Sequence, residues 1–121
     1  DLAGYRRDQV YIRSSMHVPP RPEAVSDAMA ALFLLLREEQ EPCVRAVLGH
    51  FIFVYIHPYM DGNGRIGRFL MNAMFASGGY PWTIIMKERR GDYMAALEKA
   101  IVGHDIAPFA RFLAKLVKNA V

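Results

Sequence analysis

The sequence has very few cysteines, with one among its 121 residues. A single cysteine, Cys43, excludes an internal disulfide framework and indicates a reducing compartment or one where disulfides are irrelevant. We expect a cytoplasmic location. Long apolar runs are also absent, because His50, His57 or charged residues interrupt each one, and no membrane span is expected. No signal peptide, internal repeat or low-complexity segment is recognisable.

Neither sign of charge is in large excess. Fifteen Lys and Arg residues against twelve Asp and Glu residues give a net charge of +3 at pH 7, spread along the chain. A surplus of this size slightly favours anionic ligands and does not predict nucleic-acid binding. The hydrophobic content of 53% is enough for a core, and the length suits one domain over residues 1–121.

The spacing of apolar residues predicts an all-α fold with one small β element. Residues 5–17 alternate enough to predict a short β-hairpin, closed by the prolines that follow. Helices are predicted at about 22–37, 43–57, 63–77, 92–102 and from 108 onward. Residues 81–86 are expected to be extended. The last helix has a clean apolar stripe, formed by Phe109, Phe112, Leu113, Leu116 and Val117.

One segment between the two central helices, HPYMDGNGRIGR at residues 57–68, carries most of the functional information. Pro58 ends the preceding helix, whereas Gly62 and Gly64 allow a positive φ and leave room for a closely approaching ligand. The helix that begins at about Asn63 presents unpaired N–H groups and the positive end of its dipole, which together bind anions. The loop and the helix start therefore predict a phosphate site.

The side chains of this segment add the groups needed for a transfer reaction. Arg65 and Arg68 are three residues apart, so they share a helix face, and each offers a planar fork of donors to phosphate oxygens. Asp61 supplies a hard oxygen ligand for Mg²⁺. His57, with an ordinary pKa of about 6.5, can take a proton from a hydroxyl near neutral pH. Together they predict Mg-assisted transfer of a phosphate-containing group from a nucleotide to a hydroxyl, and leave open which phosphorus is attacked.

The segment HPYxDGNGRxxR resembles the signature of Fic-domain proteins, the adenylyltransferases that attach AMP to protein hydroxyls. The likeness covers nearly the whole chain. Matching flanks are GYR at 4–6, HVPPRP at 17–22, GYP at 79–81, RGDY at 90–93 and the Pro-Phe pair at 108–109. The resemblance implies a Fic-type helical bundle with a small β-hairpin flap near the N-terminus.

The resemblance also implies roles for the residues of the segment. His57 would be the base that deprotonates a Ser, Thr or Tyr hydroxyl of the target. Asp61 would hold Mg²⁺ between the α- and β-phosphates of ATP. The anion hole around the phosphates would be formed by Gly62, Asn63 and Gly64.

Other implied roles concern the rest of the nucleotide and the target. Arg65 would contact the α- and β-phosphates, Arg68 the γ-phosphate, and Tyr93 would lie near the adenine. A flap would hold the target segment in an extended register beside the base through backbone pairing. The flap residues expected to do so are Tyr11, Ile12, Arg13 and His17.

The partners implied by the resemblance are ATP, a protein target with a hydroxyl side chain, and an inhibitory element. Many relatives carry an inhibitory helix in which a glutamate follows Ser or Thr by four positions. None of the six glutamates here does so. We therefore expect this helix to be missing from the chain and supplied by another segment or an antitoxin-like partner. No nucleic acid or membrane partner is expected, and the oligomeric state is not indicated.

Several other functions stay open. One is a related transferase, either a kinase or an enzyme that moves UMP or phosphocholine; the intact loop glycines favour AMP transfer over a kinase. Another is a zinc hydrolase with His50, His57 and Asp61 as ligands, which leaves the two arginines unexplained. A nucleotide-binding domain without turnover is a third. Removal of AMP from a target would need the inhibitory glutamate.

Overall fold

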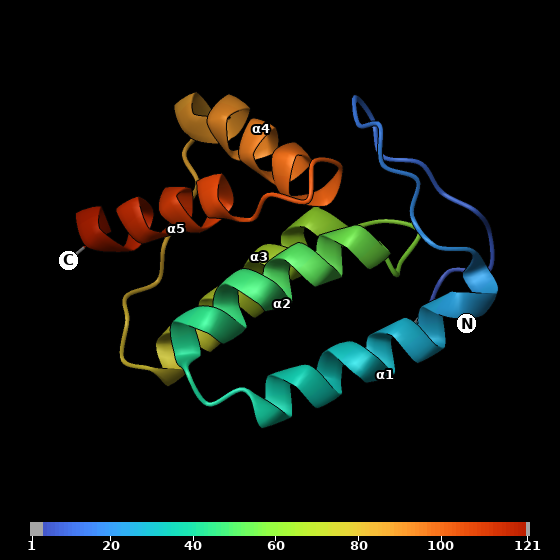
Figure 1. The fold of residues 1–121 in the computed structure, drawn as a ribbon, viewed down its shortest axis with the longest axis horizontal. Coiled ribbons are helices and arrows are strands. Elements are labelled where there is room, and N and C mark those ends of the chain that lie inside the picture. The colour runs from blue at the N-terminus through green and yellow to red at the C-terminus, as the bar shows by residue number, and fades with distance from the viewer. Residues whose placement is uncertain (1–3, 121) are drawn as a thin grey trace.

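A bundle of helices forms the architecture of the computed structural model, which describes residues 4–120 (Figure 1). Over these residues the α-helices are α1 (Pro22–Glu38), α2 (Pro42–Ile56), α3 (Asn63–Ser77), α4 (Arg90–Ile101) and α5 (Ala107–Ala120), with a short 3-10 helix, η1 (Lys87–Arg89), before α4. No strand occurs in this part of the chain. The predicted all-α class is confirmed.

Helices α2 and α3 lie side by side at the centre, with α1 along one side of α2 and α4 and α5 on the other (Figure 1). The core divides in the same way. One cluster packs α1 against α2 and contains Val25, Met29, Leu32, Phe53 and Ile56. The larger cluster joins α2 and α3 to α4 and α5, and includes Ala46, Met71, Phe75, Leu97, Phe109 and Leu113. Both clusters meet α2, which therefore fixes the position of the loop that follows it.

Local sequence signals explain where α1 and α2 begin. Pro22 and Pro42 occupy the first positions of α1 and α2, where the missing N–H group costs no hydrogen bond. The side chain of Glu41 caps α2 by accepting a hydrogen bond from the N–H of Cys43 at 3.2 Å. The predicted bounds of all five helices agree with the structure to within about two residues.

The β-hairpin predicted for residues 5–17 is wrong. The segment is extended without strand pairing and turns where the N–H of Ser15 donates to the carbonyl of Ile12 at 3.2 Å. Its two arms are joined by a side chain, because Nε2 of Gln9 donates to the carbonyl of Pro19 at 2.9 Å. Pro19 and Pro20 have no N–H groups to offer, so the returning arm cannot complete a backbone ladder.

The extended segment predicted at 81–86 is non-helical in the structure and is held by α3. Nδ2 of Asn72 donates to the carbonyl of Thr83 at 2.9 Å, and Oδ1 of Asn72 accepts from the N–H of Thr83 at 2.8 Å. No helix among residues 4–120 has the length and apolarity needed to cross a bilayer.

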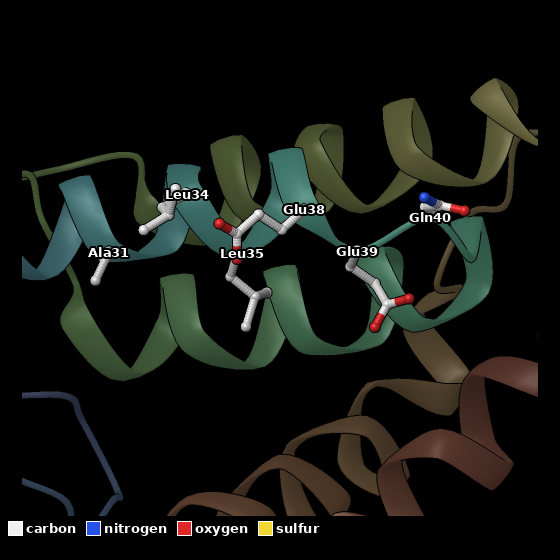
Figure 2. Close-up of a pocket in the computed structure, with 6 residues that line it drawn as sticks. All are labelled: Ala31, Leu34, Leu35, Glu38, Glu39 and Gln40. Carbon is white, nitrogen blue, oxygen red and sulfur yellow. The ribbon is translucent and has the colours of Figure 1, made fainter.

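A surface hollow of about 580 Å³ lies along the C-terminal half of α1 (Figure 2). Its lining residues are Ala31, Leu34, Leu35, Glu38, Glu39 and Gln40. None of them belongs to the 57–68 segment, so this hollow is separate from the residues singled out by the sequence.

Candidate functional site

The loop between α2 and α3 places the 57–68 segment at one end of the central helix pair (Figure 1). Helix α2 ends at Ile56, and His57 then adopts the left-handed conformation, with φ of 51° and ψ of 61°. Gly62, with φ of 80°, makes a second left-handed turn directly before α3 begins at Asn63. Non-glycine residues occupy this region at a cost, so the backbone at His57 is held by its surroundings.

The side chain of Asn63 closes the loop from inside. Its Nδ2 donates to the carbonyl of Tyr59 at 2.7 Å, and its Oδ1 accepts from the N–H of Tyr59 at 2.9 Å. Since this side chain is buried and bonded at both its oxygen and its nitrogen, the group that Asn63 can offer to an anion is its backbone N–H. Asp61 is exposed on the outer side, where one carboxylate oxygen accepts from the N–H of Gly62 at 2.9 Å.

The two arginines fold back toward the glycines of the loop. A Cβ atom built on Gly62 would lie 3.6 Å from Nη2 of Arg65, and one on Gly64 would lie 3.2 Å from Nη1 of Arg68. Within the described residues, no side chain caps the N-terminus of α3. Two guanidinium groups and the first amides of α3 therefore converge on the loop, as an anion site requires.

His57 is half-buried, and its surroundings lower the pKa of its imidazole. Burial is the main cause; the nearby carbonyl of Val54 opposes it, and the positive charges of Arg6 and His17 add to it. The buried Nδ1 of His57 makes no well-aligned hydrogen bond with any group of residues 4–120. A lowered pKa keeps the imidazole neutral near pH 7, the form that can accept a proton.

The N-terminal segment passes beside this loop, and residues 15–17 near its turn are fixed from two sides. Nε2 of His17 lies 2.8 Å from the carbonyl oxygen of Tyr55, and the two rings pack with centroids 4.2 Å apart. The carboxylate of Glu98 in α4 accepts from the hydroxyl of Ser15 at 2.5 Å and from the N–H of Met16 at 2.8 Å. The segment is thus held between α2 and α4.

The four flap residues predicted from the sequence differ in how far they are exposed to solvent. Tyr11 is 73% exposed, Arg13 is exposed, and Ile12 and His17 are half-buried. Only His17 among them contacts the end of α2. Glu98, which holds the segment from the other side, was not singled out by the sequence, and no local pattern marks it.

Behind the loop, His50 and Tyr93 form a buried pair. Nδ1 of His50 lies 2.9 Å from the carbonyl oxygen of Gly67, and its Nε2 lies 2.6 Å from the hydroxyl oxygen of Tyr93. Tyr93 was expected near an adenine; it is 4% exposed and packs against Phe109 and Phe112. Its hydroxyl group is therefore directed into the core toward His50.

This pairing contradicts a zinc site made from His50, His57 and Asp61. Both ring nitrogens of His50 already face hydrogen-bond partners, and the ring is fully buried. Within residues 4–120, no three His, Cys, Asp or Glu side chains gather closely enough to hold a metal ion.

The fold and the loop together define a helical domain whose central helices are joined by a left-handed turn, with two arginine side chains beside its glycines. Residues 2–75 match the Fic/DOC family, and the chain belongs to this family. Among solved structures, the chain is similar to Fic-1 from C. elegans, with a TM-score of 0.85 and 33% identity over 97% of this chain and 34% of that one. A Fic-domain signalling protein from Bacteroides thetaiotaomicron also gives a TM-score of 0.85, with 26% identity over 94% of this chain and 51% of that one.

Similar curated proteins carry the name "Protein adenylyltransferase Fic". The protein from Nematostella vectensis is 42% identical over 97% of this chain, and that from Drosophila mojavensis is 42% identical over the same share. The match spans 28% and 24% of those two proteins. The chain thus spans about a quarter of the length of these relatives.

Proposed function

We propose that the chain is the catalytic domain of a protein adenylyltransferase. It transfers AMP from Mg-ATP to a Ser, Thr or Tyr hydroxyl of a target protein and releases pyrophosphate. The observation that carries this proposal is the complete 57–68 segment on an uncapped helix start, in a chain 42% identical to relatives named as adenylyltransferases. We treat residues 1–121 as one Fic domain.

The nucleotide phosphates would be held by the loop and the two arginines. Backbone amides of Gly62, Asn63 and Gly64 would surround the phosphates as an anion hole. The N–H of Gly62 donates to Asp61 in the structure, so it would exchange that bond for one to a phosphate oxygen. Arg65, exposed beside Gly62, contacts the α- and β-phosphates, and Arg68 beside Gly64 contacts the γ-phosphate. Tyr93 contributes to the wall behind the adenine by packing rather than through its hydroxyl, which faces His50.

Asp61 fits a magnesium ion that is shared with the substrate. It is a single exposed carboxylate with one oxygen bonded to the N–H of Gly62, so the other oxygen is available. Mg²⁺ is commonly bound by one or two carboxylates together with phosphate oxygens and water. When bound, the ion would neutralise phosphate charge between the α and β positions.

His57 would act as the general base. Its neutral imidazole takes the proton from the target hydroxyl, and the hydroxyl oxygen forms a bond to the α-phosphorus. The bond from that phosphorus to the bridging oxygen breaks, and pyrophosphate leaves with the electron pair. The lowered pKa of His57 supports this assignment because it keeps the base unprotonated near pH 7.

The N-terminal segment would present the target to His57. Tyr11, Ile12 and Arg13 lie near its turn, and His17 fixes its return to α2. An extended segment with unpaired backbone groups can bind a target strand with little dependence on sequence. Inhibition would come from a glutamate on another segment or on an antitoxin-like partner.

The test is incubation with Mg²⁺ and ATP labelled with radioactive phosphorus at the α position, beside ATP labelled at the γ position. We expect label from the α position on a lysate protein or on the chain itself, and none after His57→Ala, which should still bind ATP. Label from the γ position alone would mean a kinase. Transfer of labelled UMP or phosphocholine in place of AMP would mean a related transferase, and equal activity of His57→Ala would remove the assigned base.

A further inference from the structure

Arg6 is a buried arginine that makes all its observed hydrogen bonds to backbone carbonyls. It is 4% exposed, and Pro20 and Asp8 accept from its Nη2 and Nη1 atoms at 2.6 and 3.1 Å. No carboxylate of residues 4–120 lies within 4.0 Å of its guanidinium. Burying an unpaired charge is costly unless its donors are hydrogen-bonded. The carbonyl contacts of Arg6 therefore offset the cost of burying its guanidinium.

Three of these contacts fall on consecutive residues at the end of α2. Nη2 of Arg6 donates to the carbonyl of Ile56 at 3.0 Å, and Nε donates to the carbonyl of His57 at 2.7 Å. The backbone N–H of Arg6 donates to the carbonyl of Pro58 at 2.8 Å. The last carbonyls of a helix lack intrahelical partners, and here one residue supplies them across the change of direction at His57.

We propose that Arg6 is the positioning residue for His57: its three donors fix the left-handed turn that aims the imidazole at the substrate hydroxyl. This inference rests on the proposed function of His57 as the base. Left-handed backbone is unfavourable for a non-glycine residue. The turn therefore needs a fixed partner, and the planar fork of an arginine can hold two carbonyls at once.

The same residue also bears on the charge state of the base. The charged groups acting on the imidazole of His57 are Arg6 and His17, both on the N-terminal segment, and both lower its pKa after burial itself. No carboxylate among the described residues lies within 4.0 Å of that imidazole. Because Arg6 reaches Pro20 and Asp8 as well, it joins the base of the flap segment to the turn that carries His57.

Two substitutions of Arg6 distinguish its effect on the position of His57 from the effect of its charge. Arg6→Lys keeps the charge but replaces the fork by one ammonium group, which cannot hold the carbonyls of Ile56 and His57 in the same geometry. Arg6→Gln keeps an N–H donor but removes the charge. Arg7→Gln is the matched control, because Arg7 is the exposed neighbour.

The first measurement is the pKa of His57 by NMR titration of its ring protons, assigned with His57→Ala. We expect a pKa below 6.5 in the parent protein, a higher value in Arg6→Gln, and values close to the parent in Arg6→Lys and Arg7→Gln. This measurement needs no substrate, so it tests Arg6 even if the protein does not transfer AMP. An unchanged pKa of His57 in folded Arg6→Gln would overturn the claim that the charge of Arg6 lowers this pKa.

The second measurement is steady-state AMP transfer. A displacement of about 1 Å at a reacting group can cost about 100-fold in rate. We expect kcat to fall by about that factor in both Arg6 variants, with KM for ATP within about twofold of the parent value, and Arg7→Gln to match the parent. Parent-like kcat in Arg6→Lys with a native circular dichroism spectrum would overturn the positioning role, even if Arg6→Gln does not fold. Absence of AMP transfer in the parent protein would instead count against the proposed function.

Discussion

The hydroxyl oxygen of Tyr93 lies 2.6 Å from Nε2 of His50, and this contact joins α2 to α4 inside the core. The other ring nitrogen, Nδ1, lies 2.9 Å from the carbonyl oxygen of Gly67. A carbonyl only accepts, so we assign the proton to Nδ1, and Nε2 then accepts from the Tyr93 hydroxyl. A neutral imidazole satisfies both partners. This arrangement places a neutral histidine two turns before His57, in contact with the carbonyl of Gly67 in the 57–68 segment.

The stability of the protein should depend on pH through His50. Burial, partly offset by the bond to Gly67, lowers the pKa of His50 from 6.5 to about 4. The unfolded chain binds a proton at His50 as pH falls through 6.5, whereas the folded protein does so only near pH 4. Stability is therefore retained above pH 6.5 and lost as pH falls toward 4, by about 3 kcal/mol.

Urea unfolding of the parent protein and of His50→Gln from pH 7.5 to pH 4 measures this contribution. Carboxylates titrate in both proteins, so their effect cancels in the difference between the two free energies of unfolding. We expect the advantage of the parent protein to shrink as pH falls. A difference that stays constant over this range would show that His50 is not held neutral.

Substitution of Gly62 should destabilise the protein because of its backbone conformation and not because of a steric clash. Its φ is 80°, and a Cβ there would meet nothing closer than Nη2 of Arg65 at 3.6 Å, an ordinary contact. Gly62→Ala should lower the free energy of unfolding by about 1 kcal/mol, and Gly62→Asn by less, because Asn tolerates left-handed backbone.

Gly91 offers a matched control for this measurement. It lies within α4, and a Cβ there meets no atom within 4 Å. Gly91→Ala should therefore raise the free energy of unfolding by about 0.5 to 1 kcal/mol, the opposite sign. If thermal or urea unfolding shows that Gly62→Ala does not lower the free energy of unfolding, the left-handed turn at Gly62 does not impose the expected cost.

Local sequence signals predicted the helices and the turn before α3 because their causes are local. Pro22 and Pro42 mark helix starts, and Gly62 supplies the left-handed residue before α3. The hairpin prediction failed because alternation alone does not supply the N–H donors that Pro19 and Pro20 lack. A side chain, Gln9, joins the two arms instead.

The residues that surround His57 were less accessible to sequence reasoning. Arg6 reaches His57 across 51 positions, and Glu98 reaches Met16 across 82. Neither contact has a periodicity, so the pattern of apolar and polar residues does not encode it. Tyr93 matched a flanking motif, but the direction of its hydroxyl depends on His50 in another helix.

Arg68 should discriminate between nucleotides by the number of phosphates. If it holds the γ-phosphate, Arg68→Ala should weaken ATP binding by about 10- to 100-fold, the value of a hydrogen bond to a charged group. ADP binding should change much less. Arg65→Ala is the control, because loss of contacts to the α- and β-phosphates should weaken the binding of both ATP and ADP. Calorimetric titration measures each affinity, and an equal loss of ATP and ADP in Arg68→Ala would place Arg68 elsewhere.

Glu98 should control the order of the N-terminal segment. Its two carboxylate oxygens accept from the hydroxyl of Ser15 and the N–H of Met16, and these bonds tie the segment to α4. Glu98→Ala removes both acceptors, so limited trypsin digestion should cleave faster after exposed Arg13. Glu98→Gln keeps one acceptor and should give an intermediate rate.

The control for this digestion is Glu88→Ala, which changes an exposed glutamate in η1 and should leave cleavage after Arg13 at the parent rate. In the transfer assay, a loosened segment should raise KM for the protein target and leave the affinity for ATP unchanged, because the hydrogen bonds of Glu98 go to Ser15 and Met16 and not to residues 57–68. Parent-like digestion of Glu98→Ala would mean that the contact between His17 and Tyr55 holds the segment alone.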